Sequence, residues 1–274
     1  MSTAPNAPQE KLNALCSLLA ELEGVAVAFS GGVDSALLLT VAHKVLGDRA
    51  VAFTLRSALA PARELRDAQG FCAMYGIEHV IIDLEMVDLA SFVDNPPDRC
   101  YLCKRIMFER IIAAAASRGL AAAAEGSNLD DDNDYRPGLK ALTELGVLSP
   151  LKAAGLTKKD IRILSRELGL PTWDKPSCAC LATRLPFGTP LTQEALQRID
   201  AAEDYLIASG LRQVRVRLHG DVARIECDEE GMGLFTSPAF QRTIYETLKV
   251  LGFAFVSLDL GGFVSGSMNQ TMTD

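Results

Sequence analysis

The sequence lacks three features that would direct the protein to a membrane or a nucleic acid. It has no apolar run near the roughly 20 uncharged residues that a bilayer-spanning helix needs. Its N-terminus, MSTAPNAPQEKLNAL, lacks the basic and apolar regions of a signal peptide. It has no Lys/Arg-rich tract and a formal net charge of −8, whereas nucleic-acid binding needs clustered basic side chains. We therefore expect a cytoplasmic protein with a small-molecule substrate, and neither a membrane nor a nucleic acid as partner.

Length and composition indicate a globular protein with more than one unit. The chain has 274 residues, of which 49% are hydrophobic, enough for a large core and a smaller second unit. It contains seven cysteines, an odd number. In a cytoplasmic protein such cysteines are free thiols, metal ligands or catalytic groups more often than structural disulfides.

The most informative stretch is AFSGGVDSALLL, residues 28–39. An apolar strand at residues 25–29 leads into it, and residues 36–46 follow at helical spacing. Two glycines, Gly31 and Gly32, allow a tight turn and close approach of the backbone to a ligand. A helix that begins here presents unpaired N–H groups, so the pattern predicts a phosphate-binding loop.

This loop differs from two common nucleotide-binding turns. No lysine follows its glycines, as one does in GxxxxGK[ST], and it does not match GxGxxG. The string SGGVDS instead resembles the PP-loop of the ATP-pyrophosphatases, enzymes that split ATP to AMP and pyrophosphate by adenylating a carbonyl or carboxylate oxygen. The alternative is a Gly-Gly turn without a ligand.

Strands and helices alternate through the first part of the chain. Further strands are expected at residues 49–57 and 79–84, whereas the alanine run within residues 121–128 fits either a strand or a helix. Helices are expected at residues 62–76 and 101–119. The order predicts an α/β fold with a doubly wound, mostly parallel sheet.

Ligands of doubly wound sheets bind beyond the carboxyl ends of the strands. Ser30, Ser57 and Gly126 each follow an expected strand, so we expect them to converge on one nucleotide pocket. The expected contacts of the nucleotide are Ala28, Ser30, Gly31, Gly32, Val33, Asp34, Ser35, Ser57, Gly126 and Asn128. Asp34 is also expected to be needed for pyrophosphate release.

The segment EGSNLDDDNDYRPG, residues 125–138, leaves its strand into a cluster of carboxylates. In one interpretation residues 126–128 face the nucleotide while Asp130 or Asp131 helps to hold Mg²⁺, which prefers oxygen ligands beside a triphosphate. In the other interpretation the segment is a solvated turn.

Two cysteine motifs form a second chemical signal. Cys100 and Cys103 lie at i and i+3, on one face of an expected helix, and Cys178 and Cys180 lie in an irregular segment some 75 residues later. Four interpretations are open: a four-thiolate zinc site, a redox dithiol at Cys100 and Cys103, buried thiols without a role, and sulfur chemistry. In the last, three cysteines hold an iron–sulfur cluster with one open iron, or one cysteine donates sulfur.

Five stretches together resemble the LarE family over nearly the whole chain. They are SGGVDS, CYLCK, EGSN with DD, KPSCACLATR with the following PFGTP and T, and GGFVSGSMN. The resemblance implies a PP-loop ATP-pyrophosphatase fold, of the adenine nucleotide alpha hydrolase-like kind. It also implies an ATP- and Mg²⁺-dependent sulfur transferase that adenylates carboxyl groups of pyridinium-3,5-biscarboxylic acid mononucleotide. That enzyme makes thiocarboxylates for the nickel-pincer cofactor of lactate racemase.

The same resemblance bears on the cysteines. In some members of the family the sulfur comes from a single-use cysteine of the motif C-L-A-[ST]-R, which is Cys180 here. Other members add a CxxC, and their three cysteines hold a [4Fe–4S] cluster that relays sulfur. Since Cys100, Cys103 and Cys180 are all present, the resemblance favours the cluster, with Cys178 as an extra sulfur in the same loop.

We expect a PP-loop domain with the cysteine site at residues 1–184 and a smaller α+β domain at residues 185–274, for substrate binding or oligomerisation. Two alternating runs around residues 219–221 predict a hairpin, with Arg215 and Arg217 on one face. This face is either solvated or a site for a substrate phosphate or carboxylate. Arg184 is a further candidate for the substrate, and Tyr101 for stacking on a pyridinium ring.

The sequence also fits other functions. A tRNA thiolase also combines adenylation with cysteine chemistry, but the acidic balance of the chain counts against it. A non-catalytic nucleotide- or zinc-binding scaffold would carry the same motifs without turnover. The resemblance further implies a homo-oligomer and allows other cofactor-maturation proteins as partners.

Overall fold

The computed structural model describes residues 7–133, 137–264 and 267–268. The chain forms two compact units. The first unit comprises Met1–Ser57, Glu64–Leu84 and Asp98–Ser177, and the second comprises Ala58–Arg63, Glu85–Pro97 and Cys178–Asp274. The main break along the chain falls between residues 177 and 178, seven residues before the boundary expected from the sequence, and two short upstream segments belong to the second unit.

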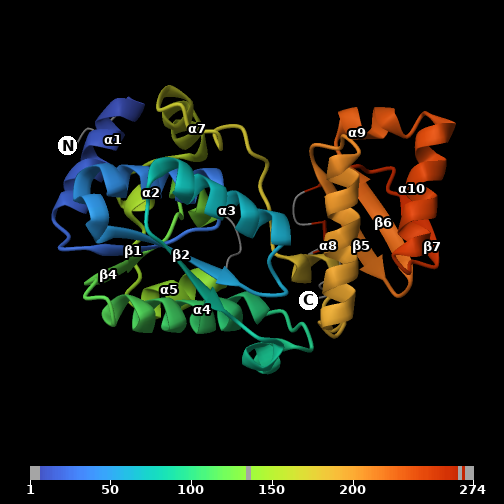
Figure 1. The fold of residues 1–274 in the computed structure, drawn as a ribbon, viewed down its shortest axis with the longest axis horizontal. Helices are drawn as coiled ribbons and strands as arrows, with labels where there is room; N and C mark the ends of the chain where they lie inside the picture. The colour runs from blue at the N-terminus through green and yellow to red at the C-terminus, as the bar shows by residue number, and fades with distance from the viewer. Residues whose placement is uncertain (1–6, 134–136, 265–266, 269–274) are drawn as a thin grey trace. The chain divides into compact units, whose positions relative to one another are not determined.

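A parallel four-stranded sheet forms the centre of the first unit (Figure 1). Its strands are β1 (Val25–Ala28), β2 (Ala50–Arg56), β3 (His79–Asp83) and β4 (Ala122–Ala124). Their order in the sheet is β3-β2-β1-β4, and all three pairings are parallel. The ambiguous alanine run therefore provides the edge strand β4 beside β1. These findings confirm the predicted doubly wound α/β fold.

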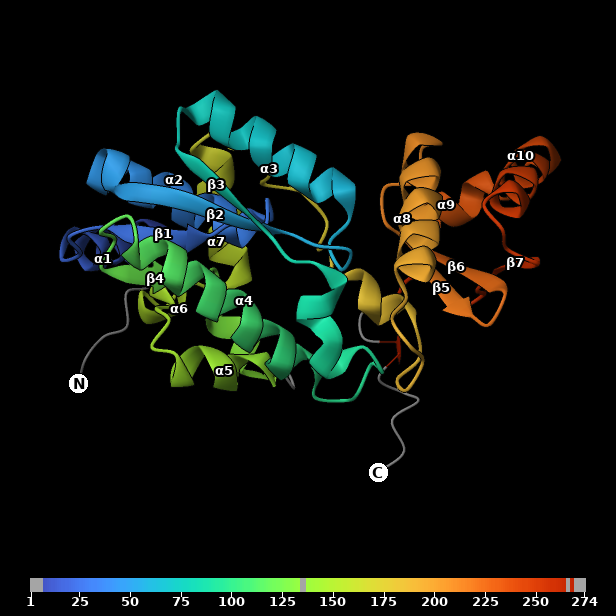
Figure 2. The same ribbon diagram turned by 60° about the horizontal axis from the view of Figure 1, so that its bottom comes forward.

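Helices cover both faces of this sheet, as the two views in Figures 1 and 2 show. Residues alternate along β1, so that Val25 and Val27 join a core with α1, α2 and α7, while Ala26 joins a core with α4. The helices of this unit are α1 (Pro8–Ala20), α2 (Val33–Leu46), α3 (Ala62–Tyr75), α4 (Arg99–Ala116), α5 (Gly138–Glu144), α6 (Pro150–Ala153) and α7 (Lys158–Glu167), with the 3-10 turns η1 (Gly47–Arg49) and η3 (Leu129–Asn133).

Helix α7 begins at a capping box. The Thr157 side chain accepts a hydrogen bond from the Asp160 amide, and the Asp160 side chain accepts one from Thr157 in return. The helical spacing of the sequence predicts that Ile161, Leu164 and Leu168 lie in the core. Ile161 and Leu164 are buried, but Leu168 is 37% exposed. The expectation for Leu168 is wrong because α7 ends at Glu167, so the helical spacing no longer applies to this C-cap residue.

The second unit is α+β, as predicted. Its sheet has the order β5-β6-β7. Strands β5 and β6 form the expected antiparallel hairpin, and Gly220 at its turn adopts a φ of 59°, which favours glycine. Strand β7 pairs with β6 in parallel. The elements are η2 (Met86–Phe92), η4 (Leu181–Arg184), α8 (Gln193–Ala208), β5 (Val214–His219), β6 (Val222–Cys227), α9 (Glu229–Leu234), α10 (Pro238–Val250) and β7 (Phe255–Leu258).

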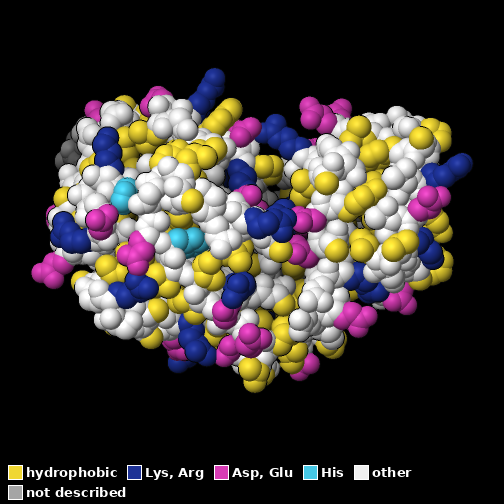
Figure 3. Space-filling model, viewed as in Figure 1, with side chains coloured by type: hydrophobic (Ala, Val, Ile, Leu, Met, Phe, Trp, Pro, Cys, Tyr) yellow, Lys and Arg dark blue, Asp and Glu magenta, His cyan; other side chains and the backbone are white. Residues whose placement is uncertain are grey.

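The described residues allow two statements about the helices and the surface. Among the described residues, no helix has both the length and the apolar character needed to cross a membrane. On the face shown in Figure 3, the side chains of Lys and Arg are interspersed with those of Asp and Glu.

Candidate functional site

The glycine-rich loop leaves the carboxyl end of β1 and turns directly into α2. Gly31 adopts a φ of 72°, a conformation that residues with a side chain rarely adopt. A Cβ at this position would lie 3.4 Å from the Glu64 carbonyl oxygen. Ser35 Oγ contacts Ser30 Oγ at 3.1 Å and donates to the Gly32 carbonyl at 3.2 Å. The hydroxyls of Ser30 and Ser35 thus stabilise the turn at the start of the helix.

The N-terminus of α2 is built to receive an anion. Its N-cap residue, Gly32, has no side chain that could accept from the first amides of the helix. Gly126, after β4, lies so close that a Cβ would stand 3.0 Å from the Ser35 nitrogen. A side chain at residue 126 would therefore force the two segments apart. The helix dipole and open amides suit a phosphate at this end of the sheet.

Asp34 lies at the centre of a polar network at this helix end. Asn128 Nδ2 donates to Asp34 Oδ1 at 3.3 Å, and Lys158 Nζ forms an ion pair with Asp34 Oδ2. The backbone amide of Lys158 donates to Asp130 Oδ2 at 2.8 Å. Three segments that are distant in sequence therefore meet at the loop. Lys158 could not be predicted at this loop from the sequence, because no local pattern places α7 beside α2.

Asp34 lies at the start of α2, where a phosphate is expected, and is the candidate ligand for Mg²⁺ in this network. The carboxylates of Asp130 and Asp131 accept hydrogen bonds from the amides of Lys158 and Asn128, so both already fix the backbone. No group of three or more metal-ligating side chains occurs in the part of the chain that the structure describes. A single carboxylate with nucleotide phosphates is a usual set of ligands for Mg²⁺.

Cys100 and Cys103 lie in the first turns of α4, on one helix face. Cys100 is exposed and Cys103 is half-buried, with its Sγ 3.5 Å from Met107 Sδ. Their basic neighbours have acidic partners of their own. Arg105 Nε lies 2.9 Å from Glu109, and Lys104 Nζ lies 3.9 Å from Glu125, which Ser127 and Ser149 also contact.

Tyr101, between the two cysteines, contacts α5. Its hydroxyl donates to Glu144 Oε2 at 2.7 Å, and Lys140 Nζ lies 5.6 Å from the centre of its ring. The ring thus already attracts a cation. Stacking of a pyridinium on Tyr101 stays a prediction, and it would require exchange with Lys140 or use of the other ring face.

In the second unit, Arg184 holds the loop that carries Cys180. Its side chain is fully buried, and its Nη1 donates to the carbonyls of Ala179 at 2.9 Å and Cys180 at 3.1 Å. The amide of Leu181 donates to the Leu59 carbonyl at 2.8 Å, whereas the Cys180 side chain is exposed. The backbone of the C-A-C segment is therefore fixed while its thiols face outward.

Glu203 on α8 is the counter-ion of Arg184. Arg184 Nε and Nη2 donate to its two oxygens at 2.8 and 3.0 Å, and Arg63 Nη2 and the Val216 amide add contacts at 3.2 and 3.0 Å. Burial is the largest single influence on the pKa of Glu203 and acts to raise it, but the charge and hydrogen bonds of Arg184, together with the charge of Arg215, hold the pKa below its ordinary value. The resulting stabilisation is present above the pKa of the unfolded carboxyl and is lost as pH falls through the lower folded pKa.

Replacing Glu203 with glutamine is expected to destabilise the protein by about 3–5 kcal/mol, because Arg184 would stay buried without its counter-ion. Urea unfolding at neutral pH measures the change. Asp204→Asn is the matched control, since Asp204 also contacts Arg63, at 3.5 Å, but is partly exposed. Its expected cost is below about 1 kcal/mol. Equal costs for the two variants would contradict the role given to Glu203.

Arg215 and Arg217 share one face of β5, as predicted, but both are buried, so the interpretation of a solvated face is wrong. Arg217 donates to the Thr183 carbonyl, Glu226 and Ser267. Arg215 donates to the Val214 carbonyl and stacks on Phe263. Burial, and then the nearby charge of Arg184, lower the pKa of Arg215 to about 10. It remains a cation at neutral pH, with Glu203 as a nearby anion.

The other cysteines differ from those of the two motifs. Cys72 and Cys227 are buried, and burial raises the pKa of their thiols to about 12 and about 11. Cys16 is half-buried against the core of the first unit. Burial disfavours the thiolate, so Cys72 and Cys227 are poor nucleophiles.

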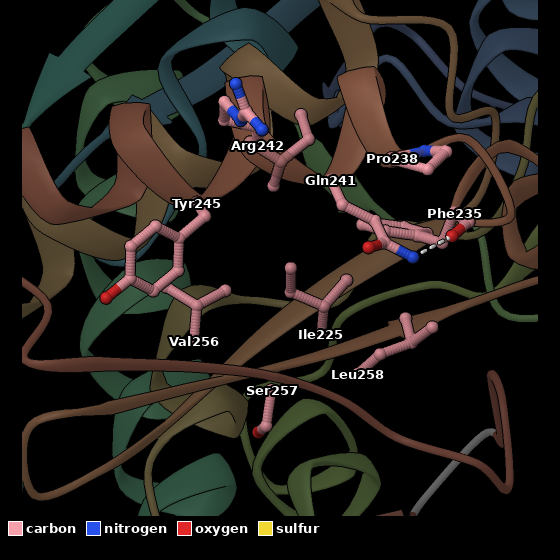
Figure 4. A pocket seen from close by; sticks show the side chains of 10 residues that line it. Ile225, Phe235, Pro238, Gln241, Arg242, Tyr245, Val256, Ser257 and Leu258 are labelled. Carbon is pink, nitrogen blue, oxygen red and sulfur yellow. Dashed lines mark hydrogen bonds between the residues drawn. The ribbon is translucent and has the colours of Figure 1, made fainter.

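A cavity of about 490 Å³ lies between α10 and the sheet of the second unit (Figure 4). Ile225, Val256 and Leu258 from the sheet face Gln241 and Tyr245 from the helix. None of the predicted site residues lines it, and its lining has no thiol and no carboxylate. We therefore do not assign the chemistry to this cavity.

Each unit thus gathers part of the predicted site. In the first unit, the loop at residues 30–35, Ser57 and the segment 126–128 follow the adjacent strands β1, β2 and β4 at one edge of the sheet. The same unit holds Cys100 and Cys103, and the second unit holds Cys180, Arg184, Arg215 and Arg217. Of the C-terminal motif GGFVSGSMN, residues 265–266 and 269 lie outside the described residues.

Comparison with known proteins decides the family. The pyridinium-3,5-bisthiocarboxylic acid mononucleotide synthase of Lactiplantibacillus plantarum is 41% identical over 260 residues, which cover 94% of this chain and 94% of that protein. The chain belongs to the LarE family. An uncharacterized protein of Synechocystis is 39% identical over 97% of this chain and 99% of its own length.

More distant matches agree with the nucleotide site of this LarE family member. The NAD synthase family matches residues 15–102, which include the glycine-rich loop. The tRNA-specific 2-thiouridylase of Azorhizobium caulinodans is 28% identical over 56% of this chain and 48% of that protein. The chain is therefore an enzyme of the PP-loop ATP-pyrophosphatase class, an ATP-dependent sulfurtransferase by family.

Proposed function

We propose that this enzyme adenylates a carboxylate of pyridinium-3,5-biscarboxylic acid mononucleotide and converts it to a thiocarboxylate, in the synthesis of a nickel-pincer cofactor. The Lactiplantibacillus relative is named for the corresponding bisthiocarboxylic product, and the two chains match over nearly their full lengths. One observation carries the proposal: the same chain has both chemical parts. These are an anion-binding helix N-terminus at α2 and the exposed thiol of Cys180 on a fixed loop.

The chemistry needs both parts. A carboxylate resists nucleophilic attack because of its own charge, so one of its oxygens first attacks the α-phosphorus of ATP and pyrophosphate leaves. A sulfur nucleophile then attacks the acyl carbon, and AMP leaves with the former carboxylate oxygen. The amides at the start of α2 stabilise the charge of the departing pyrophosphate. Mg²⁺ held by Asp34 would neutralise the same charge.

The sulfur has two candidate sources, an iron–sulfur cluster and a cysteine of the chain. We propose, from the family resemblance, that Cys100, Cys103 and Cys180 hold a [4Fe–4S] cluster. The shared helix face of Cys100 and Cys103 suits two of its ligands, and Cys180 is exposed for a third. When bound, such a cluster supplies an open iron that can carry sulfur. The alternative is Cys180 as a single-use donor.

Metal analysis of protein purified without oxygen separates these possibilities. A cluster predicts about four iron and four sulfide per chain, lost when any one of the three cysteines is replaced. Zinc alone would assign the cysteines to structure. Protein without metal that forms product and leaves dehydroalanine at residue 180 would establish single use instead.

Arg215 is the proposed site for the phosphate of the substrate, because it is a buried cation near Arg184. The Arg215→Ala variant is expected to raise KM for the pyridinium mononucleotide by roughly 10- to 100-fold, the loss of a charged hydrogen bond, with little change in KM for ATP. Steady-state assays with each substrate varied in turn measure this. Equal increases in both constants would refute a site for the substrate phosphate.

An isotope experiment tests the function itself. With the substrate carboxylates labelled with ¹⁸O, adenylation followed by sulfur attack transfers a labelled oxygen to AMP. Mass spectrometry of AMP after turnover is expected to show the label together with thiolated product. Unlabelled AMP would contradict activation of the carboxylate.

A tRNA thiolase is the second candidate, favoured only by the partial match to a tRNA-specific 2-thiouridylase. It predicts binding of tRNA that weakens steeply as salt rises. The net charge of −8 and the interspersed charges in Figure 3 favour the small-molecule substrate. Cytoplasmic location, assembly as a homo-oligomer and partner maturation proteins stay predictions from the sequence.

A further inference from the structure

Glu125 is a buried carboxylate that the proposed chemistry does not use. It follows β4 directly and is 5% exposed. Its Oε1 accepts a hydrogen bond from the Ser149 hydroxyl at 2.7 Å, and its Oε2 accepts one from the Ser127 hydroxyl at 2.8 Å. Lys104 Nζ lies 3.9 Å from the same Oε2 and supplies a positive charge. Burial of a carboxylate is costly unless it is paired and hydrogen-bonded, so these contacts determine where the side chain lies.

Lys104 lies in the first turns of α4, as Cys100 and Cys103 do. The start of α5 packs against it, because a Cβ at Gly138 would lie 3.0 Å from Lys104 Cγ and 3.3 Å from the Cys100 carbonyl oxygen. The Lys104 ammonium also lies 5.4 Å from the centre of the Phe108 ring. Packing against α5 and this ring limits the directions open to the side chain, and its ammonium reaches the buried carboxylate.

The segment 126–128 joins this carboxylate to the start of α2. Gly126 is the residue after Glu125, and a Cβ at Gly126 would stand 3.0 Å from the Ser35 nitrogen of α2. The next residue, Ser127, donates to the Glu125 carboxylate. A phosphate at the open amides of α2 would therefore adjoin the segment that carries and holds this side chain.

We propose that Glu125 is a positioning residue for the cysteine pair and makes the order of that pair depend on bound nucleotide. A nucleotide at α2 restrains the segment 126–128, the restrained segment fixes Glu125, and Glu125 holds Lys104 and with it the first turns of α4. Cys100 and Cys103 are then ordered while ATP is in place, before the sulfur step that follows adenylation. Glu125 makes and breaks no covalent bond. The proposal rests on the nucleotide site of the proposed function.

Hydrogen–deuterium exchange followed by mass spectrometry tests this coupling on the full chain, with Mg²⁺ and α,β-methylene-ATP as the probe. In the wild-type protein the probe is expected to slow exchange at residues 99–108 by about threefold, the size of effect expected from one partly exposed ion pair. Glu125→Gln keeps the size of the side chain but removes its charge. Protection at residues 99–108 is expected to disappear in this variant while protection at residues 30–35 remains. Lys104→Met breaks the same link, leaves the buried carboxylate in place, and is expected to give the same result.

Glu144→Gln is the matched control, because it also removes a carboxylate that contacts the turn of the cysteine pair. Glu144 is the last residue of α5 and accepts a hydrogen bond from the Tyr101 hydroxyl at 2.7 Å. Its replacement leaves the link through Lys104 intact. The probe is therefore expected to protect residues 99–108 in this variant as in the wild-type protein.

Two results would overturn the coupling. Protection at residues 99–108 that persists in Glu125→Gln would mean that the nucleotide acts on α4 without Glu125. Protection that is lost in Glu144→Gln as well would mean a general loosening of α4. In the wild-type protein, protection at residues 30–35 alone would refute only the coupling, whereas no protection at either place would refute the nucleotide site and the coupling together.

Discussion

Replacing Asp34 with alanine is expected to lower the rate of pyrophosphate release by at least about 1,000-fold, because the variant loses the carboxylate that would hold Mg²⁺ beside the triphosphate. Asp34 lies at the open N-terminus of α2, where Asn128 and Lys158 contact its two oxygens. Release is measured with ATP and the pyridinium mononucleotide together.

Asp48→Ala is the control for Asp34→Ala. Asp48 is exposed in the turn η1, at the other end of α2, and its loss removes the same charge. It is expected to leave turnover unchanged. Turnover of Asp34→Ala at the rate of the control would remove the glycine-rich loop from the mechanism.

Cys180→Ala is expected to retain pyrophosphate release in a single turnover but to form no thiolated product. The loop should keep its shape, because Arg184 binds the main-chain carbonyls of residues 179 and 180 and not the thiol. Only the sulfur is then lost, and with it the step that follows adenylation. Rapid quench with detection of pyrophosphate and product by mass spectrometry separates the two steps.

Cys178→Ala is the comparison for Cys180→Ala, since it removes an exposed thiol from the same loop, two residues away. It is expected to keep sulfur transfer, because the family motif C-L-A-[ST]-R begins at Cys180. Thiolated product from the Cys180→Ala variant, or its loss only in Cys178→Ala, would refute the role assigned to Cys180.

The fold of the first unit follows from local signals. The strand, glycine turn and helix at residues 25–46 are specified by apolar spacing and by Gly31, whose positive φ is a backbone property. The same holds for the capping box of α7 and for the hairpin at Gly220. Each of these features depends on residues close together in the chain.

Pairings between distant residues could not be predicted in this way. Lys158 and Asp34 are 124 residues apart, and Arg63 reaches Glu203 across 140 residues. Two short segments, Ala58–Arg63 and Glu85–Pro97, join the second unit although they lie within the sequence of the first. The packing of whole helices and strands determines these contacts, and no local sequence pattern predicts that packing.

The arginines of β5 also combine a feature that the local sequence predicts with one that depends on distant residues. Strand spacing of two correctly places Arg215 and Arg217 on one face. Whether that face is solvated depends on what covers it. Here Arg217 contacts the Thr183 carbonyl of η4 and Arg215 stacks on Phe263, and both side chains are buried. The role of these arginines toward a substrate phosphate stays a prediction.

The most direct test of the proposed reaction is the mass of the product. Purified protein is incubated with pyridinium-3,5-biscarboxylic acid mononucleotide, Mg-ATP and a sulfide source, and the nucleotide is analysed by mass spectrometry. We expect replacement of a carboxylate oxygen by sulfur, dependent on ATP, with AMP and pyrophosphate formed alongside. ATP cleavage without any thiolated nucleotide, or a thiolated nucleotide formed without ATP, would contradict adenylation-driven sulfur transfer.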